Sequence, residues 1–163
     1  MRVAAGGLLI CQLVVPVALS GDEWNRVQIP DPAIALAIRS ILAEASRRLA
    51  TPQCQKTLTD FHDKEGRPLA ERLVTLGVDV QGYMRLILFR DGSAYEACGR
   101  TLAYTHPASR VVYVCSRAVE RHWSGDREHL VVTIIHELLH TLGLGENPPS
   151  SSAINQRVRR RCS

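Results

Sequence analysis

The sequence predicts a single α+β domain in which a small mixed or antiparallel sheet packs on two helices. Two stretches, residues 32–49 and 126–142, carry apolar residues at helical spacing. Between them, residues 101–105 and 111–115 are rich in residue types that favour strands, and a short loop joins them into the pattern of an antiparallel hairpin. Residues 21–163 are long enough to bury one core and too short for two domains.

The first 20 residues predict a secretory signal peptide that precedes the domain. Arg2 supplies an early positive charge, residues 3–19 form an apolar run, and Ala18 and Ser20 fit cleavage after Ser20. The run is at the short limit of the roughly 20 residues that span a bilayer, which argues against a membrane anchor. We therefore expect a secreted or periplasmic protein with no stable membrane insertion.

The first long helix is expected to begin at Asp31 and Pro32. Aspartate is a good N-cap, and proline suits the first helical position. Apolar residues then follow one face as far as Leu49, with Arg47 and Arg48 in the last turn, where the helix dipole favours cations. We interpret this segment as a packing helix.

The middle of the chain gives weaker signals. Residues 68–76 predict a short helix that ends at Gly77. The adjacent His62 and Asp63 lie in a polar stretch, and we interpret them as a surface pair. Residues 83–90 fit a strand followed by a turn, although a helix over residues 80–89 is the alternative. Residues 116–125 are expected to connect the hairpin to the second long helix.

That second helix, residues 126–142, contains the pattern His-Glu-x-x-His. His136 and His140 lie four residues apart, so both imidazoles can point at one ion from the same face. Glu137 lies beside that ion, where its carboxylate can take a proton from a metal-bound water. Two surface histidines on an amphipathic helix are the simpler alternative, but the apolar neighbours predict a buried helix, in which histidines need partners. His129 lies outside this register and is expected to face solvent.

Glu146 is the predicted third ligand. Gly143 is expected to end the helix in a left-handed conformation, which turns the chain back toward the histidines. Downstream of His140 the chain has no further His and no Asp, Glu146 is its one carboxylate, and Cys162 is the other donor. Two histidines, one carboxylate and a water form a catalytic zinc site, so Zn²⁺ is the predicted cofactor. Upstream donors without a spacing argument remain as alternatives: His62, His106 and His122.

The stretch from His136 to Glu146, H-E-x-x-H-x-x-G-x-x-E, resembles the active-site motif of the zincin metallopeptidases. It is similar to the metzincins, which have His at the last position, and to the snapalysins, small secreted bacterial proteases with Asp there. No Met-turn follows, because Met1 and Met84 are the only methionines. The resemblance implies a zincin-like fold, in which the helix over residues 32–49 is the helix that backs the sheet. It also implies hydrolysis of peptide bonds, with Glu137 as the general base.

The resemblance also implies how a substrate would lie. In zincins the edge strand of the sheet lies above the active-site helix and binds the substrate as an added strand. One strand of the predicted hairpin is the natural candidate for this edge strand. Three side chains of the hairpin are candidates for contacts with the substrate or with an oxyanion, although a structural role is favoured for each one taken singly: Tyr104, His106 and Tyr113.

Four cysteines remain after the signal peptide: Cys54, Cys98, Cys115 and Cys162. An even number in an exported protein predicts two disulfides, and four cysteines allow three pairings. Cys98 and Cys115 flank the predicted hairpin, which favours that pair and leaves Cys54 with Cys162. A cysteine-rich zinc site would need closely spaced pairs, and the sequence has none.

The net charge of +4 is modest, and part of it lies in a C-terminal arginine cluster, Arg157, Arg159, Arg160 and Arg161. No aromatic platform or reading motif accompanies the cluster, so a solvated helix face is favoured over a nucleic-acid site. We expect a monomer whose partner is a peptide or protein substrate and not a nucleic acid. Two alternatives remain open: a zincin-fold module that binds metal without catalysis, and a metal-free domain held by disulfides.

Overall fold

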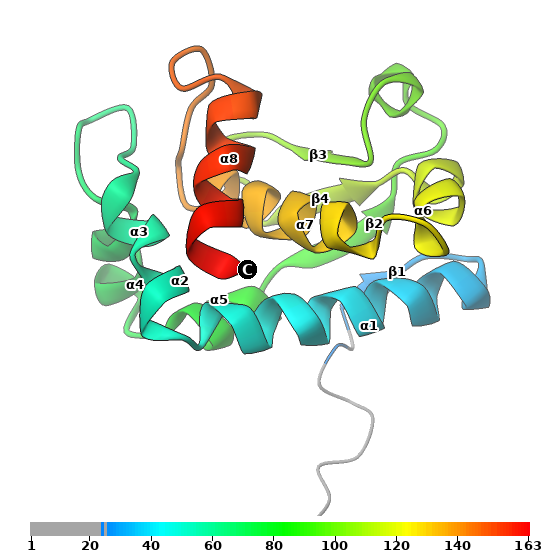
Figure 1. Ribbon diagram of the computed structural model, residues 1–163, viewed down its shortest axis with the longest axis horizontal. Coiled ribbons are helices and arrows are strands. Elements are labelled where there is room, and N and C mark those ends of the chain that lie inside the picture. The colour runs from blue at the N-terminus through cyan, green and yellow to red at the C-terminus, as the bar shows by residue number, and fades with distance from the viewer. Residues whose placement is uncertain (1–23, 25) are drawn as a thin grey trace, which may run out of the picture.

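The computed structural model describes Trp24 and residues 26–163 (Figure 1). The predicted signal peptide, residues 1–20, lies outside the described residues. The helices along the chain are α1 (Pro32–Leu49), α2 (Pro52–Gln55), α3 (Thr57–Asp60), α4 (Leu69–Leu76), α5 (Val80–Arg85), the 3₁₀ helix η1 (Glu96–Gly99), α6 (Ser116–Trp123), α7 (Arg127–Thr141) and α8 (Ser151–Cys162). The strands are β1 (Val27–Gln28), β2 (Leu88–Asp91), β3 (Ala103–Thr105) and β4 (Val111–Val114).

The four strands form one mixed sheet in the order β1-β2-β4-β3. β1 pairs with β2 and β2 with β4 in parallel, whereas β3 pairs antiparallel with β4 and lies at the edge. The register places Phe89 opposite Val112 and Tyr104 opposite Tyr113. The predicted α+β class, with a small mixed sheet and an antiparallel hairpin, is therefore confirmed.

The core lies between the sheet and the two long helices. Val112 and Val114 of β4 are fully buried, as are Ile41 and Leu42 of α1 and Ile135 of α7. Full burial of one such side chain stabilises the fold by roughly 1.5–3 kcal/mol relative to exposure. α1 runs along α7 and α7 contacts β3 and β4, so the helix with the His-Glu-x-x-His pattern lies between the backing helix and the hairpin (Figure 1).

α1 begins as the sequence predicts. The Asp31 carboxylate accepts hydrogen bonds from the backbone N–H groups of Ala33 (2.8 Å) and Ile34 (3.1 Å), and Pro32 occupies the first helical position. These bonds satisfy donors that have no partner within the helix. α4 also ends as predicted, at Gly77, whose φ of 65° is left-handed.

Two segments differ from the prediction. Residues 83–85 belong to the helix α5 and only residues 88–91 form a strand, so neither a strand from Tyr83 nor a helix as far as Phe89 is correct. The Asp79 carboxylate starts α5 by accepting a hydrogen bond from the Gly82 N–H at 2.6 Å. The predicted connection over residues 116–125 contains the helix α6, whose only buried side chains are Ala118 and Val119. Such a small apolar face gives little periodic signal.

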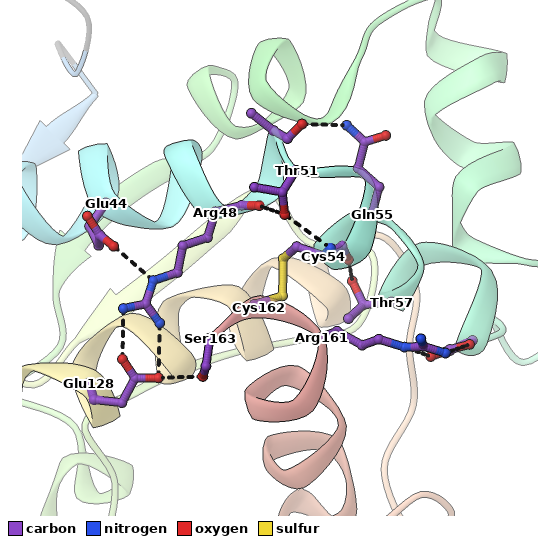
Figure 2. The surroundings of a disulfide bond; sticks show 12 residues. Glu44, Arg48, Thr51, Cys54, Gln55, Thr57, Glu128, Arg161, Cys162 and Ser163 are labelled. Atoms are coloured by element: carbon purple, nitrogen blue, oxygen red, sulfur yellow. Dashed lines mark hydrogen bonds and ion pairs between the residues drawn. A yellow bond between two sulfur atoms is a disulfide. The ribbon is translucent and has the colours of Figure 1, made fainter.

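Two disulfides have the favoured pairing, Cys54 with Cys162 and Cys98 with Cys115. The first joins α2 to the last turn of α8, beside an ion pair between Arg48 of α1 and Glu128 of α7 (Figure 2). The Glu128 carboxylate also accepts a hydrogen bond from the Ser163 hydroxyl at 3.0 Å. The C-terminal end of α8 is therefore fixed to α1, α2 and α7.

Ion pairs tie α8 to α3 as well. Arg157 Nη1 lies 2.8 Å and Arg161 Nε 2.9 Å from Asp60 Oδ2. These hydrogen-bonded arginines, Arg161 first, hold the pKa of the Asp60 carboxyl below its usual value. Two arginines of the C-terminal cluster, Arg157 and Arg161, thus have a structural partner in Asp60. Within the described residues, no helix is long and apolar enough to span a membrane.

Candidate metal centre

His136 and His140 lie one turn apart on α7 and face each other. The Asp126 carboxylate caps this helix by accepting a hydrogen bond from the His129 N–H at 2.9 Å, as the sequence predicts. The two imidazoles are buried, their ring centroids are 4.7 Å apart, and their Nε2 atoms are only 2.9 Å apart. The helical spacing therefore brings both rings to one point, as predicted.

The turn after α7 brings Glu146 to the same point. Gly143 has a φ of +116°, and the Leu144 N–H donates to the Leu139 carbonyl at 3.1 Å, which closes the helix end. The chain then reverses, so that Glu146 Oε1 lies 3.6 Å from His136 Nε2 and 3.7 Å from His140 Nε2. One potential ligand atom from each of these three residues lies within 4.8 Å of the others, so the group could hold a metal ion.

The other nitrogen of each ring is already bound. His140 Nδ1 lies 2.7 Å from the Leu144 carbonyl oxygen, and His136 Nδ1 lies 2.8 Å from Asn155 Oδ1 in α8. A carbonyl oxygen only accepts, so each Nδ1 carries the hydrogen and each neutral ring has its lone pair on Nε2. Burial, and then the neighbouring His140, lowers the pKa of His136, which favours the neutral ring.

This tautomer leaves two lone pairs facing each other across 2.9 Å, with the Glu146 carboxylate beside them. Three acceptors that converge without a hydrogen between them repel one another unless a cation lies among them. Fixing Nδ1 by a backbone or side-chain oxygen is also how metal-bound histidines are oriented in general. The residues present therefore fit a divalent metal ion.

Glu137 follows His136 in the sequence but is oriented toward the sheet. The side chain is buried, and burial, assisted by the charge of Glu146, raises the pKa of Glu137 to about 8. A hydrogen bond from the backbone of Thr105 in β3 acts in the opposite direction. The carboxyl group thus lies between the histidine pair and the edge strand, close to the candidate ligands without being one of them.

A pocket of about 380 Å³ opens beside His136 and Glu137. α7 forms one side of it, α8 and α6 contribute further walls, and the segment from η1 to β3 closes the remaining side. The residues that line it are Gly99, Arg100, Thr101, Leu102, Ala118, Arg121, His122, His129, Thr133, His136, Glu137, Ser151 and Asn155.

Tyr104 and Tyr113, two of the candidates for substrate or oxyanion contacts, pack against each other on the hairpin. Tyr104 and Tyr113 stack with ring centroids 5.1 Å apart, and Tyr95 packs against both rings edge-on. Side chains alternate along a strand, so Tyr113 lies on the opposite face of the sheet from the buried Val112 and Val114. These tyrosines form a surface aromatic cluster.

The alternative histidine ligands lie elsewhere. His62 and His106 are exposed, and neither belongs to the candidate metal group. His122 and His129 line the pocket with ring centroids 5.7 Å apart, and His129, near the start of α7, is only partly buried there. Sequence reasoning missed Asn155, because a single Asn in a polar helix gives no signal before the packing of α8 on α7 is known.

Comparisons with known proteins add no relative: no family model matches the chain, and no curated protein or solved structure is similar to it. Among the residues that the structure describes, His136, His140 and Glu146 are the one group found that could hold a metal ion. The interpretation of the site therefore rests on its own geometry and chemistry.

Proposed function

We propose that the protein is an exported zinc-dependent peptidase whose metal is held by His136, His140 and Glu146. The observation that supports this most strongly is the approach of the His136 and His140 Nε2 atoms to 2.9 Å beside the Glu146 carboxylate, with a second carboxyl group, Glu137, next to them. Two histidines and one carboxylate are a ligand set of hydrolytic zinc sites. All four cysteines of the described chain are in disulfides, so thiolate ligands do not compete.

Glu137 is the proposed general base. Zinc in such a site lowers the pKa of a bound water and polarises a carbonyl group. The Glu137 carboxylate would accept the proton of the attacking water and pass it to the leaving nitrogen. Its burial next to the candidate ligands suits this role, because burial raises the pKa of a carboxyl group toward the range in which it can both take up and release a proton.

β3 is the proposed strand for substrate binding. It is the edge of the sheet, and its Thr105 backbone lies within hydrogen-bonding distance of Glu137. The loop that follows β3 is held to α7 by a hydrogen bond from the Ala108 N–H to the His140 carbonyl at 2.9 Å. An extended peptide that added to this edge would place its backbone beside the proposed base.

The two disulfides indicate an oxidising, extracytoplasmic environment. This agrees with the signal peptide predicted for residues 1–20, and we propose secretion or export to the periplasm. A peptide or protein substrate and a monomeric state are part of the same proposal.

The test compares zinc-loaded wild-type protein with Glu137→Gln, which keeps the size of the side chain but does not accept a proton. Cleavage of a mixed peptide library, followed by mass spectrometry, should fall by about 10²–10⁴-fold in this variant, because a general base contributes a factor of that size. Zinc content should be unchanged. Glu120→Gln, an exposed carboxylate on α6, is the matched control and should keep full activity.

The outcomes separate the alternatives. Wild-type protein that binds zinc but cleaves nothing would leave a metal-binding module without catalysis. Wild-type protein that binds no zinc would leave a metal-free domain held by disulfides. Equal cleavage by wild type and Glu137→Gln would show that another group is the base.

A further inference from the structure

The pocket beside His136 and Glu137 is lined by basic residues from three separate segments. Arg100 comes from the end of η1, Arg121 and His122 from α6, and His129 from the first turn of α7. Among the described residues that line it, Glu137 is the one acidic residue, and it lies at the end next to the candidate metal ligands. Away from Glu137, the charge of the pocket is therefore positive.

The two arginines have no carboxylate of their own. Neither Arg100 nor Arg121 forms an ion pair with any residue that the structure describes, whereas Arg48, Arg67, Arg157 and Arg161 all do. A guanidinium has five N–H donors in a planar fork that matches a carboxylate, and it stays charged at any physiological pH. Both side chains are exposed at the pocket, where a carboxylate from outside the chain can reach their donors.

The two histidines of the pocket, His122 and His129, add hydrogen-bonding nitrogens and a neighbouring cation. His122 Nδ1 lies 2.9 Å from the Ala118 carbonyl, so Nδ1 donates there and Nε2 is left for another partner. His129 Nδ1 lies 3.4 Å from Arg159 Nη2, which adds a further cation beside the pocket. Burial, opposed by Asp126 and reinforced by Arg159 and His122, lowers the pKa of His129.

The pocket and the candidate metal centre share residues. His136 and Glu137 line both, and Asn155, which binds His136 Nδ1, forms part of the same wall. In Figure 1 α6 and α8 flank α7, with β3 above it, so the pocket lies alongside the path proposed for the substrate. A side chain that enters the pocket would belong to a residue close to the peptide bond that is cleaved.

We propose that this pocket is a side-chain subsite for aspartate or glutamate, held by Arg100 and Arg121, and that the substrates are peptides with an acidic residue beside the scissile bond. This inference rests on the proposed peptidase function and adds its substrate class. Ser151, Thr133 and Asn155 supply neutral polar groups to the same pocket, which suits a hydrated carboxylate better than an apolar side chain.

Two short peptides test it. Both end in a hydroxamate, a zinc-binding group, and they differ only in the residue beside it, which is Glu in one and Gln in the other. Isothermal titration of zinc-loaded protein should show the Glu peptide binding about tenfold more tightly, because a carboxylate adds charge-assisted hydrogen bonds that an amide lacks. In the double variant Arg100→Gln/Arg121→Gln the two peptides should bind within about twofold of each other, as expected once those bonds are lost.

Arg117→Gln is the matched control. Arg117 is an exposed arginine on the same helix as Arg121 but does not line the pocket, so its loss should leave the preference for Glu intact. Equal binding of the Glu and Gln peptides to wild type, failure of both to bind, or a preference that survives loss of both arginines would each overturn the inference.

Cleavage of the peptide library, measured in parallel, reports on the proposed function separately. Cleavage without a preference for acidic residues would overturn the subsite and leave the peptidase. A preference for the Glu peptide that depends on the two arginines, in a protein that cleaves nothing, would support the subsite and refute the peptidase.

Discussion

Asn155 orients the ring of His136 through a side-chain hydrogen bond. Its Oδ1 lies 2.8 Å from His136 Nδ1 and holds the Nε2 lone pair toward His140 and Glu146. His140 is oriented by a backbone carbonyl, Leu144 O, which no substitution of a side chain removes. The two candidate ligands therefore differ in how they can be perturbed.

Asn155→Ala should weaken zinc binding by about 10–100-fold, the usual effect of losing an outer partner of a metal-bound histidine. Gln156→Ala, an exposed neighbour on the same helix, should have no effect. Competition with a chromophoric chelator measures both affinities. An unchanged affinity in Asn155→Ala would mean that the ring of His136 is held in place by packing alone.

Glu137 should make the metal-free protein less stable as pH rises. Its pKa is raised to about 8, so the folded protein keeps a proton that the unfolded chain, with an ordinary value of 4.5, has released. The free energy of unfolding therefore falls as pH rises through this interval. The lowered pKa of His136 acts in the opposite direction, but only below its ordinary value of 6.5.

Among the described residues with a shifted pKa, Glu137 is thus the one expected to change the free energy of unfolding between pH 6.5 and 8. The fall in the free energy of unfolding should approach, and not exceed, about 1.4 kcal/mol per pH unit. Urea denaturation at several pH values with a chelator present measures it. Glu137→Gln should show no such fall, and an equal fall in both proteins would assign the effect to another group.

At the scale of elements, α8 is the piece that completes the site. It contributes Asn155 to the metal centre and one wall to the basic pocket, and its far end is fixed by the disulfide between Cys54 and Cys162 and by Asp60 (Figure 2). The chain between these cysteines is long, with a sequence separation of 108 residues, against 17 for the Cys98–Cys115 disulfide.

Removing the disulfide that closes the longer loop should therefore lower the free energy of unfolding by more. In the chain-entropy description, closing loops of these lengths stabilises the folded state by about 4.7 and about 3 kcal/mol. Cys54→Ala/Cys162→Ala should lower the free energy of unfolding by more than Cys98→Ala/Cys115→Ala, and it alone should weaken zinc binding. Denaturant unfolding and chelator competition on both double variants measure this. The reverse order of the two effects would contradict the role given to α8.

The elements predictable from sequence are those with a strong local signal. α1 and α7 have broad apolar faces and aspartate caps, and the spacing of His136, His140 and Glu146 follows from one helix and one glycine turn. α5 is predicted only as an alternative, because six residues are too few to separate a helix from a strand by periodicity, and α6 is missed because only Ala118 and Val119 are buried. Asn155, Arg100 and Arg121 reach the site only through tertiary packing, which no spacing along the chain encodes.

At the scale of the whole molecule, the sheet and the helices bring the three parts of the proposed site together around α7. The edge strand β3 has backbone groups next to Glu137, the histidine pair and Glu146 could hold a metal ion, and the basic pocket is the proposed subsite for an acidic side chain. The two disulfides hold the segments that surround this side together, as suits a small protein outside the reducing cytoplasm.

Zinc titration of the metal-free mature protein, in competition with a chromophoric chelator, tests the central claim most directly because it gives both stoichiometry and affinity. Wild type should bind one zinc per chain. Glu146→Ala should bind at least about 100-fold more weakly, since loss of a direct ligand costs no less than loss of an outer partner, and Glu146→Asp should recover part of that affinity. Much less than one equivalent in wild type, or an unchanged affinity in Glu146→Ala, would contradict the assignment of His136, His140 and Glu146 as the zinc ligands.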